Sequence, residues 1–237
     1  MPINKRYLTE EYLRQNPSWD EEDSPWKAQK IINLLARWRI SPQSVCEVGC
    51  GAGGVLAALR DHLGPAVPLV GYDIAPALQN FWVKHRDQQI TFKLADFLQE
   101  PEDSRYDILI MVDVIEHLEN PFYFLKQVLR RANWFILLIP LELHALGAIR
   151  NTPFIRARQK LGHLHFWNKD LTLMMLQDCG MNVIAWEYAL SSIELVSPTL
   201  ARSLARWPRK FFFSLAPNWT ARTLGGFSLL VLARPSS

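Results

Sequence analysis

Residues 47–54 read Glu47-Val48-Gly49-Cys50-Gly51-Ala52-Gly53-Gly54, and this stretch decides the fold. It follows a short apolar run at 44–48 and precedes the helical apolar spacing of residues 55–63. Glycines between a strand and a helix allow a tight turn and a close approach of the backbone to a ligand. Asp73 stands nineteen residues after Gly54, at the end of the next apolar run, where a carboxylate can accept both ribose hydroxyls of an adenosine.

The same alternation of short apolar runs and helical segments continues along the chain. The expected strands are 44–48, 69–73, 90–94, 106–112, 134–139, 182–188 and 227–233. Helical spacing is expected at 55–63, 75–84, 121–131 and 170–178. Continuous apolar strands that alternate with helices are typical of a parallel sheet covered on both faces. The sequence therefore predicts an α/β fold, doubly wound around a mostly parallel seven-stranded sheet.

Three parts of the chain are expected to differ in role. Residues 1–40 are interpreted as a helical extension that acts as a lid, and residues 41–237 as the main domain. Residues 191–226, before the last strand, form an insert on the acceptor side. Trp26 and Lys27 are expected to close over the ligand.

Composition excludes several classes of protein. The net charge of +3 is too small for the basic stripe of a nucleic-acid binder, so we expect no nucleic-acid partner. The longest strictly apolar run, 134–139, is far shorter than the roughly 20 residues of a membrane span. Three cysteines without paired metal spacing and a polar start without an apolar leader favour a cytoplasmic protein.

The glycine pattern alone leaves two nucleotide ligands open. Gly49, Gly51 and Gly54 also match the G-x-G-x-x-G pattern of nicotinamide dinucleotide sites. Glu47 argues against a pyrophosphate, because like charges repel, and it suits a cationic ligand. Asp96-Phe97 after the third strand offers a carboxylate for an adenine amine and a ring for the base. The 113–121 stretch, DVIEHLENP, follows the fourth strand.

With these motifs, the chain resembles the class I S-adenosylmethionine-dependent methyltransferases, of the broad UbiG and methyltransferase-domain type. The resemblance implies a Rossmann-like fold and, as its product, S-adenosylhomocysteine. It implies that Glu47, Gly49 and Gly51 line the methionine part of S-adenosylmethionine, that Asp73 holds the ribose and that Asp96 and Phe97 flank the adenine. Val112 and Asp113 would face the sulfonium. The expected cofactor-binding set also includes Cys50, Gly53 and Ile74.

The expected reaction is in-line methyl transfer, most plausibly O-methylation of a small-molecule acceptor. An NAD(P)-dependent oxidoreductase with the same loop, or a non-catalytic cofactor-binding subunit, stays as the alternative. His117 is the candidate base for a neutral hydroxyl, with His165 second. The structural interpretation is that Glu116 and His117 anchor the helix that begins near Pro121.

Metal binding is a further alternative for the same stretch. Some O-methyltransferases of this superfamily hold a divalent ion between an acidic-x-x-Glu-His stretch and a later histidine, and Asp113, Glu116, His117 and His165 could imitate that set. Because the first acidic residue is Asp and the downstream match is partial, we expect no metal site.

The insert carries five basic residues against Glu194 and is rich in aromatic side chains. A helix is expected at 198–207, capped by Ser197 and followed by Phe211-Phe212-Phe213. Such a segment can lie on an anionic membrane surface, so 197–213 is a candidate for peripheral membrane contact. The favoured interpretation is that the insert covers the acceptor pocket. Its composition indicates a hydrophobic or anionic acceptor.

Overall fold

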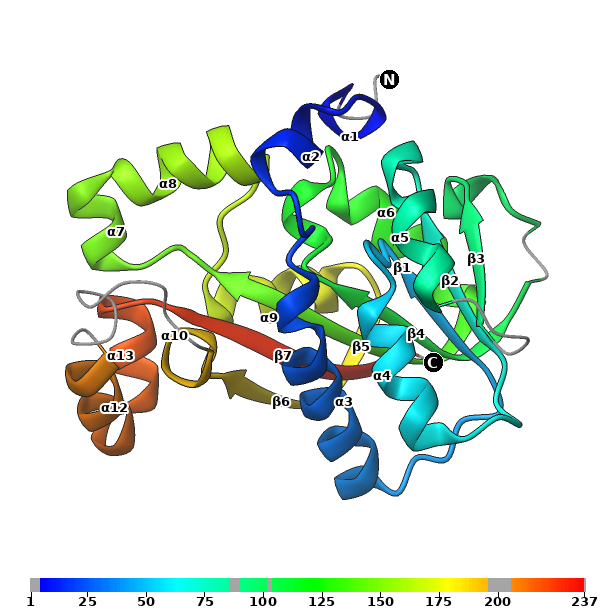
Figure 1. Cartoon of the computed structure of the whole chain (residues 1–237). Coiled ribbons are helices and arrows are strands. Elements are labelled where there is room, and N and C mark those ends of the chain that lie inside the picture. Colours follow the sequence, from blue (N-terminus) through cyan, green and yellow to red (C-terminus); the bar gives the residue numbers. More distant parts are fainter. Residues whose placement is uncertain (1–4, 86–89, 102–103, 196–205, 237) are drawn as a thin grey trace.

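The computed structural model of the chain describes residues 5–85, 90–101, 104–195 and 206–236. Seven strands form one sheet in the order β3-β2-β1-β4-β5-β7-β6 (Figure 1). Its strands are β1 (Val45–Val48), β2 (Leu69–Asp73), β3 (Ile90–Leu94), β4 (Tyr106–Val112), β5 (Ala132–Leu141), β6 (Met181–Ala189) and β7 (Phe227–Pro235). Strands β1 to β5 pair in parallel, whereas β7 runs antiparallel to both β5 and β6. The predicted mostly parallel seven-stranded sheet is confirmed.

Helices cover both faces of this sheet. The larger helices are α3 (Ser24–Trp38), α4 (Gly54–Leu63), α6 (Pro121–Val128), α9 (Lys169–Asp178), α12 (Arg206–Leu215) and α13 (Pro217–Thr223). Shorter ones are α1 (Lys5–Leu8), α2 (Glu11–Gln15), α5 (Gln79–Trp82), α7 (Ala145–Arg150), α8 (Thr152–Arg156) and α10 (Ser191–Glu194). The helix expected at 75–84 is instead a 3-10 turn, α5 and a second 3-10 turn.

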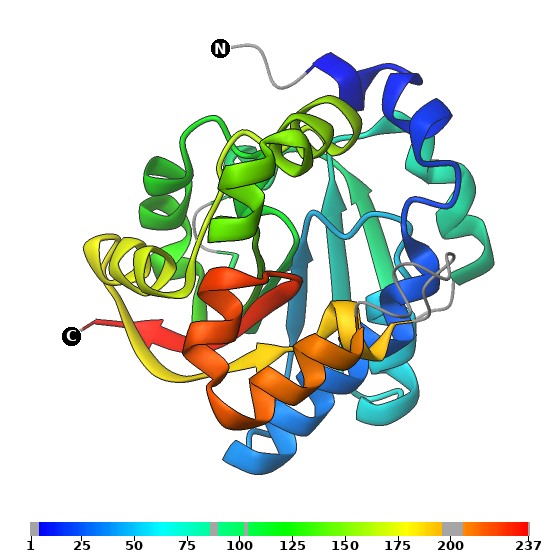
Figure 2. The same ribbon diagram turned by 90° about the vertical axis from the view of Figure 1, so that its left-hand side faces the viewer.

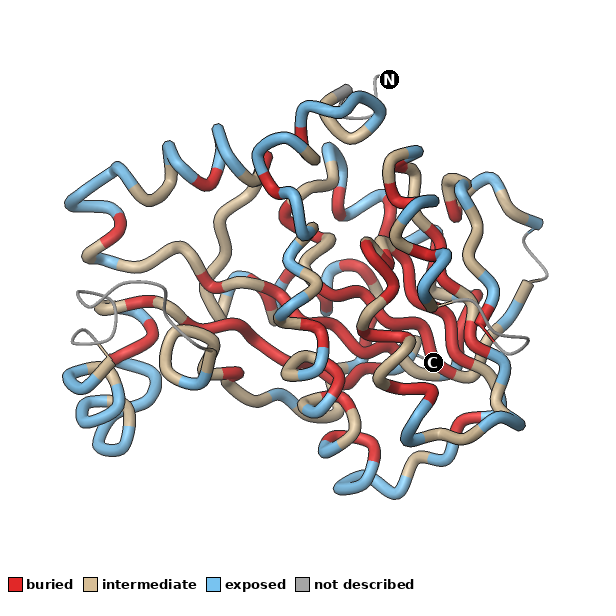
Figure 3. Tube along the Cα trace, viewed as in Figure 1, coloured by how far each residue is buried: buried red, intermediate tan, exposed pale blue. Residues whose placement is uncertain are grey.

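The two faces of β4 show why the strand is apolar throughout. Ile108 and Ile110 pack into the core cluster that α3, α4 and α5 share, while Leu109 and Met111 pack into the cluster shared with α6 and α9. Successive side chains of a strand point to opposite faces, so a strand that is covered on both sides buries all of them. Figure 3 shows the resulting buried band along the central strands.

The strand order places a crevice beside β1. The chain proceeds outward from β1 through β2 to β3 and then returns to the other side of β1 at β4. The two halves of an open sheet diverge at such a switch point, and ligands bind there, beyond the carboxyl ends of the strands. The glycine-rich turn 49–54 leaves β1 at this point.

The N-terminal segment lies across the same end of the sheet. Arg6 donates to the carbonyl oxygens of Arg158 and Gln159, at 3.3 and 2.6 Å, and this ties α1 to the turn before Gly162. Helix α3 buries Ile31 and Leu34 in the core, so it is part of the helical layer. The lid role proposed for 1–40 therefore concerns the segment that precedes α3.

The insert forms a separate helical pair. Both views place α12 and α13 at the opposite end of the molecule from α1 and α2 (Figure 2). Most of the helix expected at 198–207 lies outside the described residues, and α12 begins at Arg206. Within the described part of the chain, no helix is long and apolar enough to cross a membrane.

Candidate functional site

A cavity of about 760 Å³ lies at the crevice beside β1. Its walls come from the glycine-rich turn, the carboxyl ends of β2 and β4, the segment 113–124 and the stretch around His163. Residues Tyr7 to Lys27 of the N-terminal segment supply part of another wall. Segments far apart in the sequence therefore meet around one cavity.

The glycine-rich turn is shaped for close approach. Gly49, Gly51 and Gly53 have φ angles of +72°, +51° and +86°, the left-handed region that other residues avoid. A Cβ at Gly49 would lie 2.5 Å from Cγ2 of Val114, and one at Gly51 would lie 3.1 Å from Trp19. The turn needs glycine both for its backbone angles and for the space that a side chain would fill.

Glu47 lies at the floor of the cavity with an unused acceptor. The residue is 1% exposed, and its Oε2 has no hydrogen-bond partner within the described structure. Burial raises the pKa of the carboxyl well above its usual range, Lys27 opposes this shift and Asp73 adds to it. A buried oxygen without a partner is costly, so it is expected to meet a donor or a cation from a ligand.

Asp73 ends β2 at the cavity, as predicted. Its two carboxylate oxygens accept from the backbone N–H groups of Gly51 and Ala75, both at 3.0 Å. Burial raises the pKa of this carboxyl, and the backbone donors counteract part of that shift. Each oxygen keeps a lone pair for a ligand hydroxyl. Cys50 and Ile74 line the cavity beside it.

Asp96 and Phe97 both line the cavity, but in different ways. Oδ1 of Asp96 caps the following 3-10 turn by accepting from the N–H of Leu98 at 3.0 Å, which leaves Oδ2 for a ligand. The Phe97 ring is 2% exposed and packs edge-on against Tyr72, with the Arg131 guanidinium 4.9 Å from its centre. The ring is therefore part of the core, and it also lines the cavity.

The residues after β4 are held in a strained arrangement. Asp113 has a φ of +52°, rare for a residue other than glycine, while its N–H donates to Leu138 in β5. Its carboxylate pairs with Lys27 of α3 at 2.9 Å. Burial alone would lower the pKa of Lys27, but the charge and hydrogen bond of Asp113 raise it overall. Trp26, Lys27, Val112 and Asp113 all line the cavity.

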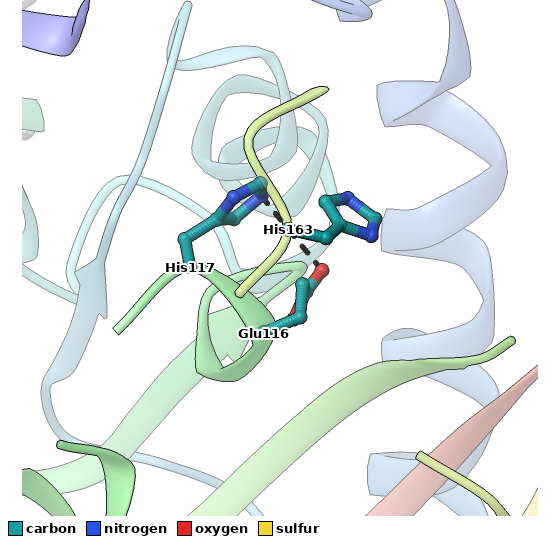
Figure 4. Close-up of side chains that lie close together, drawn as sticks. All are labelled: Glu116, His117 and His163. Atoms are coloured by element: carbon teal, nitrogen blue, oxygen red, sulfur yellow. Dashed lines mark ion pairs between the residues drawn. The ribbon is translucent and has the colours of Figure 1, made fainter. Parts of the chain in front are cut away.

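A second polar cluster occupies the other wall and consists of Glu116, His117 and His163 (Figure 4). Nδ1 of His117 lies 2.8 Å from the Tyr7 hydroxyl, and Nδ1 of His163 lies 2.6 Å from Oε2 of Glu142. Burial and the neighbouring His163 lower the pKa of His117 to about 3, so its ring is neutral at pH 7. Burial and Asp113 raise the pKa of Glu116 well above its usual range.

His165 does not belong to this cluster. Its Nε2 lies 2.9 Å from the carbonyl oxygen of Leu118, and its ring stacks on Trp167 outside the cavity wall. The histidine beside His117 is His163, two residues earlier. The sequence reasoning also missed Tyr7 and Glu142, for which it had no signal, since neither stands in a motif.

Among the described residues of the insert, those that line the cavity stand at its start. Ser191 and Leu195 line it, whereas no residue of α12 or α13 does. Among the described residues, only the part of the insert around α10 can therefore cover the pocket, as the favoured interpretation expected of the whole insert.

Comparison with known proteins places this site in a family. The chain matches the family model described as a methyltransferase domain over residues 21–186. It is 31% identical over 117 residues to a mitochondrial ubiquinone biosynthesis O-methyltransferase of Candida albicans. That match spans 47% of this chain and 34% of the relative, so the chain covers about a third of the relative's length.

Solved structures show the same fold at low identity. One is the methyltransferase in a complex with the Haloferax volcanii Trm112 methyltransferase activator, with a TM-score of 0.65, 17% identity and coverage of 95% and 94% of the two chains. Another is a plantazolicin methyltransferase bound to S-adenosylhomocysteine, with a TM-score of 0.62, 17% identity and coverage of 98% and 95%. Similarity at this level supports the fold and leaves the acceptor open.

Proposed function

The chain belongs to the methyltransferase domain family, and from this premise we propose that it methylates a small-molecule acceptor with S-adenosylmethionine as the donor. The observation that carries the proposal is the buried, unpartnered Oε2 of Glu47 beside the glycine-rich turn that lines the same cavity. S-adenosylmethionine carries an ammonium group and a sulfonium. It could therefore offer a hydrogen-bond donor and a positive charge to the unpartnered carboxyl oxygen of Glu47.

The remaining residues fit the adenosine part of the same donor. The free lone pairs of Asp73 suit the ribose hydroxyls, and Oδ2 of Asp96 suits an exocyclic amine. Gly49 and Gly51 line the cavity, and Cys50 and Ile74 supply apolar wall. Gly53, which was also expected to bind the donor, does not line the cavity, and a Cβ there would meet the Phe92 ring at 2.6 Å. The Phe97 ring is 2% exposed, so base stacking on its face is not part of the proposal.

When bound, S-adenosylmethionine supplies a methyl group activated by its sulfonium. The protein's task is to align the acceptor on the far side of that methyl group and to exclude water, and alignment alone can contribute about 7–11 kcal/mol. The strained Asp113 and its ion pair with Lys27 hold the wall next to the methyl position. Closure of residues 5–23 over the cavity would remove the remaining solvent.

A hydroxyl acceptor loses its proton as the new bond forms. His117 is neutral and faces the cavity, so it is the candidate to receive that proton. Its low pKa makes it a weak base on its own. O-methylation is therefore proposed with His117 as the group that receives this proton.

Ligand binding tests the proposal directly. Calorimetry should show binding of S-adenosylhomocysteine and no binding of NADH. Binding of NADH would instead favour the oxidoreductase alternative. Glu47→Gln should weaken binding about tenfold or more, because it removes the charge that faces the ligand. Glu187→Gln, on the partly buried outer strand β6, serves as the matched control. Failure of the wild-type protein to bind any adenosyl ligand would contradict the proposal.

We further propose that the helical pair α12–α13 contacts an anionic membrane surface. Trp207, Phe211, Leu215 and Trp219 are 75%, 60%, 68% and 53% exposed, although each is large and apolar. Lys210 is exposed beside them. Exposed aromatic side chains interspersed with cations are typical of helices that lie in the headgroup region.

Vesicle sedimentation tests the membrane contact. The protein should pellet with phosphatidylglycerol vesicles at low salt and less at high salt, because charge contributes to the attraction. The double substitution Trp207→Ser and Phe211→Ser should abolish pelleting. Trp38→Ser removes a 41% exposed tryptophan from α3 and should leave it unchanged. If the wild type and both variants pellet equally, α12–α13 is not the surface that contacts the membrane.

A further inference from the structure

Carboxyl groups dominate the walls of the cavity. Nine of the described residues that line it are Asp or Glu, whereas Lys27 is the one Lys or Arg among them, and its ammonium is paired with Asp113 at 2.9 Å. Four of the nine acids are Asp113 and the three assigned to the proposed donor. The other five line the cavity without a further Lys or Arg among the described lining residues: Asp20, Asp23, Glu116, Glu119 and Glu142. A cleft of this charge attracts cations and repels anions.

Glu116 is the acid of this group that lacks a partner. Its side chain is fully buried at the cavity, and neither carboxylate oxygen has a hydrogen-bond partner in the described part of the chain. Its backbone is held in place, because the N–H groups of Leu164 and His165 donate to its carbonyl oxygen at 2.7 and 3.2 Å. Buried polar atoms are nearly always hydrogen-bonded, so two free oxygens on a fixed side chain indicate that the donor arrives with a ligand.

His117, the nearest imidazole, does not supply that donor. The Tyr7 hydroxyl donates its single proton to the carbonyl oxygen of Leu161 at 2.9 Å. The same hydroxyl lies 2.8 Å from Nδ1 of His117, so it accepts the proton on that nitrogen. Nε2 of His117, 3.9 Å from Oε1 of Glu116, consequently carries a lone pair in the neutral ring.

His163 does not supply the donor either. Its Nδ1 lies 2.6 Å from Oε2 of Glu142, and a carboxylate accepts, so the proton of the neutral ring is used there. Figure 4 shows that the side chains of Glu116, His117 and His163 come together. Acceptor atoms therefore meet at this wall of the cavity, and the donors that they need have to come from outside the cluster.

Aromatic rings continue the wall next to His117. The Tyr7 ring lies edge-on to His117 with the ring centres 5.7 Å apart, Tyr12 lies 4.9 Å from Tyr7, and Trp19 lies 4.6 Å from Tyr12. Tyr7, Tyr12 and Trp19 all line the cavity. Aromatic rings attract cations to their faces and pack against the carbon atoms of a ligand, so this wall favours an organic cation.

We propose that the methyl acceptor is an amino alcohol, whose ammonium group binds Glu116 while His117 receives the proton of its hydroxyl. This inference rests on the proposed function. Oε1 of Glu116 and Nε2 of His117 lie 3.9 Å apart. An ammonium group and a hydroxyl on neighbouring carbon atoms are about 3–4 Å apart, so two roughly parallel hydrogen bonds of about 2.8 Å reach both acceptors at once.

The two groups of the acceptor have separate tasks. The hydroxyl oxygen forms a bond to the methyl carbon, the carbon–sulfur bond breaks with its electron pair going to sulfur, and the hydroxyl proton passes to Nε2 of His117. The ammonium group keeps its protons and fixes the orientation of the hydroxyl through Glu116. Glu116 is therefore a specificity-determining residue, and it takes no part in the transfer of the methyl group.

The charge of the cavity differs from what the insert indicates. The basic composition of the insert indicates a hydrophobic or anionic acceptor, but its described residues at the cavity are Ser191 and Leu195, and both are uncharged. The cations of the insert therefore do not set the charge of this cavity among the described residues. Glu116 and the other acids set it, and they favour an acceptor of the opposite sign.

Binding of a cation at Glu116 should release a proton. Burial raises the pKa of this carboxyl well above its usual range, Asp113 and Glu142 add to the shift, and Lys27 opposes it. The carboxyl thus holds a proton more strongly than an ordinary glutamic acid. An ammonium group beside it favours the ionised form, whereas an uncharged ligand does not.

Three ring compounds of matched shape test the preference for charge. They are trans-2-aminocyclohexanol, which is cationic at pH 7, the neutral trans-cyclohexane-1,2-diol and the anionic trans-2-hydroxycyclohexanecarboxylate. Each is titrated by calorimetry into the full chain, with and without S-adenosylhomocysteine, and with EDTA present to remove metal ions. The amino alcohol should bind about ten times more tightly than the diol or better, because hydrogen bonds to charged groups are the stronger ones. The hydroxy acid should not bind measurably.

Two variants and a change of buffer locate the preference at Glu116. Glu116→Gln should bind the amino alcohol and the diol about equally, because the charge is removed and the shape is kept. Glu22→Gln makes the same chemical change at an exposed residue that does not line the cavity, so it should keep the wild-type preference. Titrations in buffers of different ionisation enthalpy should show proton release when the wild type binds the amino alcohol, and none in Glu116→Gln. Circular dichroism confirms that each variant is folded.

The wild-type titrations decide the inference even if a variant does not fold. Failure of the amino alcohol to bind, or binding no tighter than that of the diol or the hydroxy acid, would overturn it. A preference that persists in folded Glu116→Gln would overturn the role of this residue. If the same samples bind S-adenosylhomocysteine, only the acceptor class is wrong, whereas loss of that binding in the wild type refutes the proposed function itself.

Discussion

Substitution of Gly49 by alanine tests the cavity at its most constrained point. The added Cβ would lie 2.5 Å from Cγ2 of Val114, where ordinary contact begins near 3.4 Å, so Val114 would have to move by about 1 Å. Alanine at a φ of +72° also costs about 1–2 kcal/mol of folding free energy. The substitution should therefore disturb both the turn and the wall that continues from Val114 to Asp113.

Gly64 provides a control for a glycine substitution away from the cavity. Its φ of +77° and ψ of 171° lie in a region essentially restricted to glycine, and a Cβ there would meet nothing within 4 Å. Gly64→Ala should lower the free energy of unfolding by about 1–3 kcal/mol through the backbone alone. Gly49→Ala should lower it both through the backbone and by the cost of displacing Val114.

Calorimetry with S-adenosylhomocysteine gives the decisive readout. A misplacement of about 1 Å in a positioned site can cost on the order of 100-fold, so Gly49→Ala should bind the ligand about 100 times more weakly. Gly64→Ala should bind it like the wild type. If Gly49→Ala is folded and retains wild-type affinity, the ligand does not contact this turn and the reasoning is wrong.

Three further substitutions test other parts of the site and fold. Asp73→Asn keeps one acceptor where two backbone N–H groups are bound, so it should cost about 1–3 kcal/mol in a denaturant titration and weaken S-adenosylhomocysteine binding. Lys27→Met leaves Asp113 without its counter-charge and should lower the free energy of unfolding by about 1–3 kcal/mol. Lys27→Arg keeps the positive charge, so it should restore the stability if charge and not packing is the cause. Lys93 holds the pKa of Glu100 below its ordinary value of 4.5, so that carboxylate stabilises the fold above pH 4.5 and loses this effect as the pH falls through its lowered pKa. The difference in Tm between wild type and Glu100→Gln should accordingly be present at pH 7 and vanish at low pH; a difference that is independent of pH would contradict the assignment.

Local patterns were sufficient to predict the sheet and the convergence of Glu47, Gly49 and Asp73 on one cavity. The apolar runs, the glycine-rich turn and Asp73 all depend on backbone geometry within a few residues and on the rule that parallel strands end at one edge. For that reason the positions of Glu47, Gly49 and Asp73 in one cavity followed from the sequence. The resemblance to methyltransferases, carried by the same residues, was confirmed by the family match.

The polar cluster around His117 was decided by tertiary structure. His163 and His165 lie in an irregular stretch with no periodicity, so the sequence could not indicate which ring turns toward His117. The choice depends on the left-handed turn at Gly162 and on the backbone bonds from Leu164 and His165 to Glu116. Tyr7 reaches His117 across 110 residues of chain, a contact that exists only because α1 docks on the segment before Gly162. Strands and turns arise from short-range geometry that the sequence displays directly, whereas a buried polar cluster forms from segments whose meeting depends on the packing of the whole molecule.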